Sequence, residues 1–284
     1  MLGAVYGSLA LTKGVPARDH AFFEGDGAGR PLVIAHRGGA GLWPENTLHA
    51  FERALAAGAD IIETDVRATS DGALVLMHDE RVDRTTDGSG RVADMTLEEL
   101  RRLDAGHRWT PDGGRTFPFR GRGLRVPTLD EVFKTLGGAA RLNIEPKQAS
   151  APVVQRLCAL VREHGAAERV VVASFSDSVL EEFRRSCPEV ATSASPSEAW
   201  AFLAMYEAGL AGSYSPPMHA LQVPERAGGL RVLTRGFVEA AHGRNLKVHA
   251  WTVNSEEDMR RVLAAGVDGV MTDYPDRLLK LLGR

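Results

Sequence analysis

Three carboxylates in two short apolar runs have the types and the spacing of a metal site. Glu63 and Asp65 stand two residues apart in a β-branched run, and Glu145 lies in a second run of this kind. Side chains two residues apart on a strand share a face, so we expect the three groups to converge if the runs are neighbouring strands. An all-oxygen site of this kind suits Mg²⁺ or Ca²⁺, whereas Zn²⁺ favours His or Cys ligands.

A histidine and an arginine end the first apolar run of the chain. His36 and Arg37 are followed by Gly38 and Gly39, and Pro-Glu-Asn-Thr at 44–47 marks the start of a helix. An acid/base group beside an anion clamp is the chemistry that this pair favours, because the planar guanidinium fork matches phosphate. A structural role for the pair is the alternative.

A predicted hairpin brings a second histidine close to the carboxylates. The Asp-Gly pair at 71–72 separates two alternating apolar runs, which predicts a two-residue hairpin loop. With that loop, Asp65 lies directly opposite His78 on the same face of the sheet. Glu63, Asp65 and His78 therefore form one polar patch in this interpretation.

Positive charge and further polar groups follow the later runs. Asn143 and Lys147 share the face of Glu145, so Lys147 and Arg37 supply the positive charge that a metal-bound phosphate would meet. Gln222 ends the sixth run and Trp251 the seventh. We expect both to contact the substrate, with a core position as the alternative for Trp251.

The elements that must position these residues alternate between strand and helix patterns. The expected strands are residues 32–36, 60–66, 141–145, 169–173, 190–194, 220–223, 247–252 and 268–272. Between them, helical periodicity marks residues 47–57, 152–164, 177–186, 197–208, 234–242 and 256–265. This α/β pattern predicts a (β/α)8 TIM barrel, in which the chemistry lies at the carboxyl ends of the strands. A doubly wound open sheet is the alternative, since alternation does not prove closure.

One stretch recurs near the two ends of the chain. Leu-Ala-Ala-Gly-Ala-Asp at 55–60 precedes Thr64-Asp65, and Leu-Ala-Ala-Gly-Val-Asp at 263–268 precedes Thr272-Asp273. Each copy reads as a helix end, a glycine cap and the next strand, which places Asp65 and Asp273 at the same height. Chance similarity is the alternative, and Asp273 either caps the last helix or supports the site.

The stretch 79–126 breaks the alternation. It is rich in Gly and Arg, contains one short helical pattern at 96–103, and ends before a capping box at Thr128. A segment of this length between barrel strands predicts a small insertion or lid after the second strand.

Composition excludes several classes of protein. The 34 Lys and Arg residues against 37 Asp and Glu residues give a net charge of −3, which argues against a nucleic-acid binder. The apolar stretch 2–11 is shorter than the roughly 20 residues that span a bilayer, so we expect a loose turn or an edge helix there, with a peripheral membrane contact as the alternative. Cys158 and Cys187 cannot form a disulfide framework, which favours a reducing compartment or a protein that is indifferent to redox conditions. We expect a cytoplasmic, at most membrane-associated, protein.

Several linked motifs resemble the glycerophosphodiester phosphodiesterase family. They are His-Arg-Gly at 36–38, Pro-Glu-Asn-Thr at 44–47, Glu-Thr-Asp-Val at 63–66, His-Asp at 78–79, Asn-Ile-Glu-Pro-Lys at 143–147 and Trp-Thr-Val-Asn at 251–254. The resemblance runs from about residue 31 to 281. Residues 1–30 are therefore assigned to an N-terminal extension, and 31–284 to a TIM-barrel domain containing the insertion.

The resemblance implies a metal-dependent enzyme that hydrolyses glycerophosphodiesters to an alcohol and sn-glycerol 3-phosphate. It implies a divalent metal on Glu63, Asp65 and Glu145, an acid/base pair of His36 and His78, and phosphate ligands at Arg37 and Lys147. The alternative is a lysophospholipase D that uses the same site on longer lipids. The apolar N-terminus and Leu42-Trp43, expected beside the mouth of the barrel, keep this alternative open.

Overall fold

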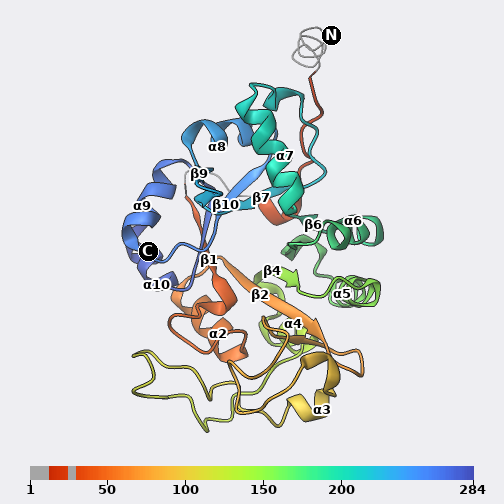
Figure 1. The fold of residues 1–284 in the computed structure, drawn as a ribbon, viewed down its shortest axis with the longest axis vertical. Helices are drawn as coiled ribbons and strands as arrows, with labels where there is room; N and C mark the ends of the chain where they lie inside the picture. The colour runs from red at the N-terminus through yellow and green to blue at the C-terminus, as the bar shows by residue number, and fades with distance from the viewer. Residues whose placement is uncertain (1–12, 25–29) are drawn as a thin grey trace.

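Eight parallel strands surround the centre of the protein (Figure 1). The computed structural model describes residues 13–24 and 30–284. The parallel strands are β1 (Leu32–Ala35), β2 (Ile61–Ala68), β4 (Arg141–Pro146), β5 (Val170–Val172), β6 (Ala191–Thr192), β7 (Ala220–Val223), β10 (Lys247–Ala250) and β11 (Gly269–Thr272). Their order is β6-β5-β4-β2-β1-β11-β10-β7, and a parallel bridge between Ser193 and Ala220 joins the two ends. The barrel prediction is confirmed, and the open sheet is excluded.

Helices follow the strands and cover the outside of the barrel. They are α2 (Leu48–Ala57), α4 (Leu129–Leu136), α5 (Ala151–Glu163), α6 (Asp177–Ser186), α7 (Pro196–Glu207), α8 (Arg235–His242), α9 (Glu256–Ala264) and α10 (Pro275–Leu281). The expected capping box at Thr128 forms, since its hydroxyl accepts from Glu131 N–H while the Glu131 carboxylate accepts from Thr128 N–H. Each helix buries its apolar stripe against the outward-facing strand residues, which form one continuous core.

The amino-terminal end of the barrel is closed by the segment 13–24. A short 3-10 turn (Ala21–Phe23) places Phe22 and Phe23 against inward-facing residues at the starts of the strands, including Leu32 and Ile61. Arg141 Nη1 donates to the Phe22 carbonyl at 2.9 Å. The centre of the barrel therefore opens at the carboxyl ends. The apolar stretch 2–11 lies outside the described residues, and the division at residue 30 stays a prediction.

The hairpin after β2 forms, but its predicted register is wrong by one residue. β3 (Leu74–Leu76) pairs Leu76 with Val66, so that Met77 N–H, not His78, bonds to Asp65 O at 3.1 Å. The loop has three residues instead of two, because Gly72 adopts the left-handed φ of 81° that ends a three-residue turn. His78 nevertheless reaches the site, since the chain leaves the ladder after Leu76.

The insertion has a small core of its own. Residues 79–126 include α3 (Leu97–Leu100) and enclose an apolar cluster with Val82, Val92 and Leu100. The helical pattern expected at 96–103 thus shortens to one turn of helix. In Figure 1 the insertion lies at the bottom of the view, across the strand ends from α7. A second addition, the β8 (Arg226–Ala227) and β9 (Leu230–Arg231) hairpin, was not predicted.

The two cysteines pair with each other, which the sequence analysis did not predict. Cys158 on α5 and Cys187 after α6 form a disulfide, with Cα atoms 5.8 Å apart. The sequence could not show this, because the pairing depends on how the two helices pack side by side. In the part of the chain that the structure describes, no helix is long and apolar enough to cross a bilayer.

Candidate active site

The three predicted carboxylates meet inside the barrel. Asp65 on β2 stands in register beside Glu145 on β4, and Glu63 stands beside Asn143. One oxygen from each of the three carboxylates lies within 4.8 Å of the others. Glu63 and Asp65 are almost fully buried at 3% and 1% exposure. Among the described residues, this set has the all-oxygen donors and the spacing that fit a hard divalent cation.

The three carboxylates together carry more negative charge than the neighbouring Lys147 and Arg37 neutralise, and burial makes this excess costly. Burial and the charge of Asp65 raise the pKa of Glu63 well above its ordinary value. Burial also raises the pKa of Glu145, against the pull of Lys147. Burial acts the same way on Asp65, but Lys147 and Arg37 outweigh it and hold the pKa of Asp65 low. An added cation would relieve this repulsion, so the residues present fit a metal ion.

Lys147 and Arg37 approach the carboxylates from two sides. Lys147 Nζ lies 2.9 Å from Asp65 Oδ1 and 2.7 Å from Glu145 Oε1. Arg37 Nε lies 3.4 Å from Asp65 Oδ2 without the geometry of a hydrogen bond, and it is one of the few buried polar atoms that lack a partner among the described residues. These cations are placed to bind an anion at the same point.

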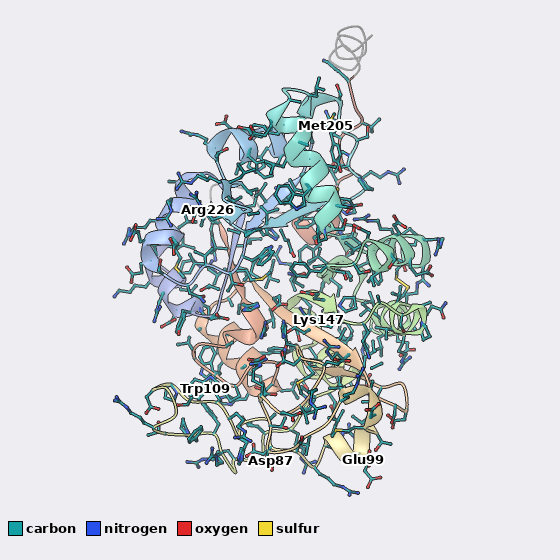
Figure 2. The ribbon with its side chains drawn as sticks, viewed as in Figure 1. Asp87, Glu99, Trp109, Lys147, Met205 and Arg226 are labelled. Atoms are coloured by element: carbon teal, nitrogen blue, oxygen red, sulfur yellow. A yellow bond between two sulfur atoms is a disulfide. The ribbon has the colours of Figure 1, made fainter. Side chains whose placement is uncertain are left out.

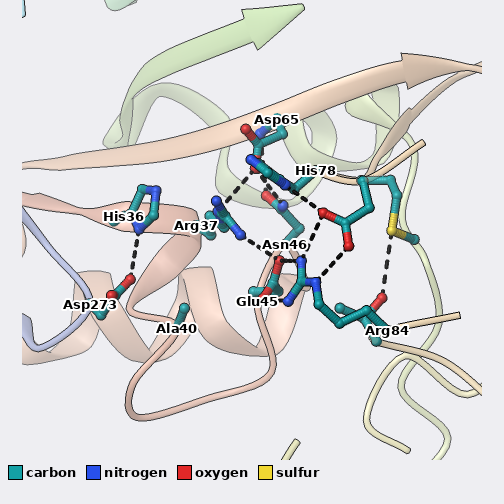
Figure 3. Close-up of polar contacts among 12 residues, drawn as sticks. His36, Arg37, Ala40, Glu45, Asn46, Asp65, His78, Arg84 and Asp273 are labelled. Carbon is teal, nitrogen blue, oxygen red and sulfur yellow. Dashed lines mark hydrogen bonds and ion pairs between the residues drawn. The ribbon is translucent and has the colours of Figure 1, made fainter. Parts of the chain in front are cut away.

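His36 is held by Asp273, which follows the last strand, β11. Its Nδ1 lies 2.6 Å from Asp273 Oδ1, which directs Nε2 toward the carboxylates, 4.0 Å from Glu63 (Figure 3). Burial lowers the pKa of His36, but the hydrogen bond to Asp273 and the charge of Glu63 outweigh it, so the pKa is raised. Asp273 thus supports the site, which decides the alternative left open by the sequence.

The backbone after His36 is shaped to the site. Arg37 has a φ of 51°, and its N–H donates to Glu63 Oε2 at 2.7 Å. Gly38 follows at φ 82°, where a Cβ would lie 2.5 Å from the ring of Phe51. Only glycine fits this approach, so the backbone after His36 makes a tight turn against α2.

His78 belongs to a network that ties the insertion to the barrel. Its Nδ1 lies 2.6 Å from Asp79 Oδ1, and Arg84 from the insertion bonds both Asp79 and Glu45 (Figure 3). Arg37 Nη1 donates to Glu45 Oε1 at 3.0 Å. Burial lowers the pKa of His78, although the bond to Asp79 partly offsets this. The pKa values of the two histidines therefore move in opposite directions.

Asp65 is fixed by an amide clamp that the sequence analysis missed. Asn46 Oδ1 accepts from the Thr64 hydroxyl at 2.8 Å and from Asp65 N–H at 3.3 Å, and its Nδ2 donates to Asp65 Oδ2 at 2.9 Å. Asn46 adopts a φ of 56°, which asparagine tolerates better than most residues. The recurrence of Asn eighteen residues before Thr-Asp was a signal for this clamp.

The pocket above the carboxylates has a volume of about 390 Å³. Gln222 and Trp251 line it as expected, together with both histidines. Gln222 Oε1 accepts from Asn143 Nδ2 at 3.2 Å, while Asn143 Oδ1 is buried without a partner among the described residues. An unpaired acceptor here suits a hydroxyl of a ligand.

The two residues expected beside the mouth of the barrel do not line the pocket. Leu42 and Trp43 are absent from its wall, and Trp43 packs against the main core instead. All the predicted site residues meet in or beside this pocket. They are His36, Arg37, Glu63, Asp65, His78, Glu145, Lys147, Gln222 and Trp251. Their roles in turnover stay predictions.

Comparison with known proteins covers nearly the whole barrel. The glycerophosphoryl diester phosphodiesterase family matches residues 36–277. A glycerophosphodiester phosphodiesterase of Caldanaerobacter subterraneus is 38% identical over 262 residues, which make up 89% of this chain and 98% of that relative. A Bacillus subtilis glycerophosphodiester phosphodiesterase is 35% identical over 264 residues, 89% of this chain and 86% of that relative.

Solved structures share the fold. A glycerophosphodiester phosphodiesterase from Agrobacterium tumefaciens superposes with a TM-score of 0.70 at 28% identity, covering 88% of this chain and 99% of that one. An Oleispira antarctica phosphodiesterase in complex with the product sn-glycerol-3-phosphate superposes with a TM-score of 0.73 at 27% identity, covering 90% and 98%.

Proposed function

The chain belongs to the glycerophosphoryl diester phosphodiesterase family, and from this premise we propose that it hydrolyses glycerophosphodiesters to an alcohol and sn-glycerol 3-phosphate with the help of Mg²⁺ or Ca²⁺. The convergence of three carboxylates, two of them buried, beside Lys147 and Arg37 carries the proposal. Glu63, Asp65 and Glu145 would hold the cation, which would neutralise the phosphate and stabilise charge on its oxygens. The protein cations then bind the remaining phosphate oxygens.

Chelation and one substitution test the metal. After treatment with a chelator, hydrolysis of glycerophosphocholine should stop and return on addition of Mg²⁺ or Ca²⁺. Glu145→Gln should lower kcat/KM by about two to three orders of magnitude with an unchanged circular dichroism spectrum, because the side chain keeps its shape. Full activity of the chelated enzyme contradicts the metal assignment.

The two histidines would move the protons. His36 Nε2 faces the carboxylates and takes a proton from the attacking hydroxyl, while His78 gives one to the leaving alcohol. Asp273 and Asp79 each orient one ring through Nδ1. The profile of kcat/KM against pH should be bell-shaped, lose its acid limb in His36→Ala, and lose its basic limb in His78→Ala. Wild-type profiles in both variants count against these roles.

The nucleophile is the 2-hydroxyl of the substrate's own glycerol. This hydroxyl adjoins the phosphate, and an intramolecular attack gains an effective molarity that can reach roughly 10⁵ M. The first step releases the alcohol and leaves a 1,2-cyclic phosphate, which water then opens. A 2-deoxy analogue should bind through its phosphate yet turn over very poorly. Near-normal hydrolysis of that analogue would instead make water the nucleophile.

Release of the head group from lysophospholipids by the same site is the second candidate. It is favoured by the pocket wall opposite the carboxylates, which is apolar. The cytoplasmic location and the membrane contact of the N-terminus stay predictions, and the disulfide between Cys158 and Cys187 removes the argument for a reducing compartment. Comparing glycerophosphocholine with lysophosphatidylcholine as substrates, with each cation, separates the two candidates.

A further inference from the structure

Arg84 of the insertion bonds two carboxylates that stand beside the candidate active site. Its Nε donates to Asp79 Oδ2 at 2.6 Å. Its Nη1 and Nη2 donate to the two oxygens of Glu45, in the turn before α2, each at 2.7 Å. In Figure 2 the insertion, labelled at Asp87, lies below Lys147 in the view. Arg84 therefore joins the insertion to the barrel at the edge of the site.

Each of these two carboxylates also holds a residue of the predicted site. Asp79 Oδ1 lies 2.6 Å from Nδ1 of His78. Glu45 Oε1 accepts from Nη1 of Arg37 at 3.0 Å (Figure 3). The Nη2 atom of Arg84 bonds these same two oxygens, Glu45 Oε1 at 2.7 Å and Asp79 Oδ1 at 3.3 Å. One nitrogen atom of the insertion thus stands between the two oxygens that hold the histidine and the arginine.

The backbone that carries Arg84 is anchored in the core of the insertion. The N–H and the hydroxyl of Thr86 both donate to the Val82 carbonyl, at 3.1 and 2.9 Å. Val82 and Thr86 are fully buried. The side chain of Asp83 accepts from Gly90 N–H at 3.1 Å. The folded insertion therefore sets where the guanidinium of Arg84 lies.

Opposite charges hold the two carboxylates to Arg84. Burial acts to raise the pKa of Glu45, but the bonds from Arg84 and the charge of Arg37 outweigh it and hold that pKa low. Burial acts the same way on Asp79, but the bonds with Arg84 and His78 lower its pKa to about 2. Both carboxylates therefore stay charged near neutral pH. Without the planar fork of Arg84, each would lose the partner that fixes its orientation.

We propose that Arg84 is a positioning residue that couples proton transfer to phosphate binding. Through Asp79 it holds the ring of His78 in the orientation that protonates the leaving alcohol. Through Glu45 it holds the guanidinium of Arg37 against the phosphate. The inference rests on the proposed function, because it takes the roles of His78 and Arg37 from there. Correct folding of the insertion is then a condition for turnover.

The leaving group separates an effect on His78 from a general loss of activity. Choline leaves as an alcohol only when it receives a proton, whereas para-nitrophenolate leaves without one. The probes are therefore glycerophosphocholine and the para-nitrophenyl ester of sn-glycerol 3-phosphate. In Arg84→Ala, kcat/KM for glycerophosphocholine should fall by about 10- to 100-fold more than kcat/KM for the nitrophenyl ester. An equal loss on both substrates, or no loss, overturns the proposal.

Binding of the product tests the route through Arg37. sn-Glycerol 3-phosphate presents a phosphate to Arg37 but has no leaving group. Its inhibition constant should rise by about three- to tenfold in Arg84→Ala, because a guanidinium that is no longer held in one orientation must be ordered when the phosphate binds. An unchanged inhibition constant overturns the coupling of proton transfer to phosphate binding.

A double variant tests whether Arg84 acts on His78 through Asp79. Asp79→Ala alone should lower the ratio of the two kcat/KM values, glycerophosphocholine over nitrophenyl ester, about as much as Arg84→Ala does. Adding Arg84→Ala to Asp79→Ala should then lower the ratio no further, because the route is already broken. Two losses that multiply in the double variant overturn this route.

Arg101 provides the matched control for the anchoring of the insertion. Its Nη2 donates to Glu131 Oε1 on α4 at 2.6 Å, so it also ties the insertion to the barrel, away from the pocket. The side chains of Arg84 and Arg101 are 47% and 42% exposed. Arg101→Ala should leave the ratio and the inhibition constant at their wild-type values, and the changes seen in Arg84→Ala appearing here as well would overturn the proposal. Arg84→Met, which fills the same space without a charge, carries the same expectations if Arg84→Ala does not fold.

Failure of the inference is distinguishable from failure of the proposed function. If the wild-type enzyme hydrolyses neither ester, the proposed function fails and the inference fails with it. If His78→Ala leaves the ratio unchanged, the role of His78 as the acid fails, and the inference again fails with it. If His78→Ala lowers the ratio and Arg84→Ala does not, only the inference fails.

Discussion

Two strand–helix–strand units from opposite ends of the chain hold a carboxylate in the same way. The unit β1–α2–β2 carries the clamp of Asn46 on Asp65, and in β10–α9–β11 the side chain of Asn254 makes the same three bonds to Thr272 and Asp273. The amide and the threonine hydroxyl are 18 residues apart in both units. The two units are also neighbours in the barrel, where β1 pairs with β11.

The likeness extends to the start of the second strand in each unit. Asp60 Oδ2 accepts from Val33 N–H at 2.8 Å, and Asp268 Oδ2 accepts from Val248 N–H at 2.8 Å. In both units this carboxylate ties the second strand to the first, and the glycine before it has a left-handed φ. The recurrence is therefore structural, and chance similarity of the two sequences does not explain it.

The units differ in what their carboxylates meet. Asp65 faces Lys147 and the two other carboxylates, whereas Asp273 faces His36. In the first unit, the connection from β1 to Asn46 is long and contains His36 and Arg37. In the second unit, the connection from β10 to Asn254 is short and contains Trp251. One scaffold thus presents a carboxylate at the carboxyl end of a strand, and its neighbours decide whether it would hold a metal or orient a base.

The same substitution in both clamps gives the sharpest contrast, and we expect the larger effect at the metal site. Asp65→Asn should lower kcat/KM for glycerophosphocholine by about two to three orders of magnitude, because a carboxylate that would hold the cation becomes neutral. Cation affinity, measured by calorimetry, should fall in parallel. Asp65→Asn enzyme with wild-type activity would remove Asp65 from the metal site.

Asp273→Asn should cost less and act through pH. The loss of kcat/KM should be about 10- to 100-fold, typical of a group that orients another. Asp273 helps to raise the pKa of His36, so without the carboxylate that pKa falls. Titration of the His36 ring followed by NMR should therefore show a lower pKa in Asp273→Asn than in the wild-type enzyme. A wild-type pKa for His36 in this variant would show that Asp273 does not act on the base.

The asparagines themselves should differ in their contribution to stability. Asn46 is 4% exposed, so Asn46→Ala strands buried groups of Thr64 and Asp65 and should lower the free energy of unfolding by about 2–3 kcal/mol. Asn254 is less buried, and Asn254→Ala should cost about 1–2 kcal/mol because water can replace part of the clamp. Urea denaturation measures both. Equal losses would mean that burial does not set the strength of the clamp.

The smallest effect on catalysis is expected outside both units. The disulfide links α5 to the end of α6, so replacing Cys158 and Cys187 together by Ser should leave kcat/KM unchanged. The free energy of unfolding should fall by about 2–4 kcal/mol, since the crosslink constrains the unfolded chain. A large loss of activity would show that the geometry of the clamps depends on this distant side of the barrel.

Strong local patterns made most of the architecture predictable. The strand 220–223 and the helix 177–186 form with the bounds expected from sequence, and the other barrel elements shift by a residue or two at their ends. The hairpin register was not predictable to one residue, because loop length depends on which backbone conformation Gly72 adopts. The β8–β9 hairpin gave no periodic signal, since each of its strands has two residues.

The sequence by itself determined which residues could do chemistry and that strands would carry them to one end of a barrel. The spacing of two in Glu63 and Asp65 and the alternation of strand and helix are local properties, so they survive without knowledge of the fold. Tertiary structure alone decided that Asp273 holds His36 across 237 residues of chain, that Cys158 bonds Cys187, and that the pocket has an apolar wall. These contacts join segments far apart in the sequence, and only the closure of the barrel sets their distances.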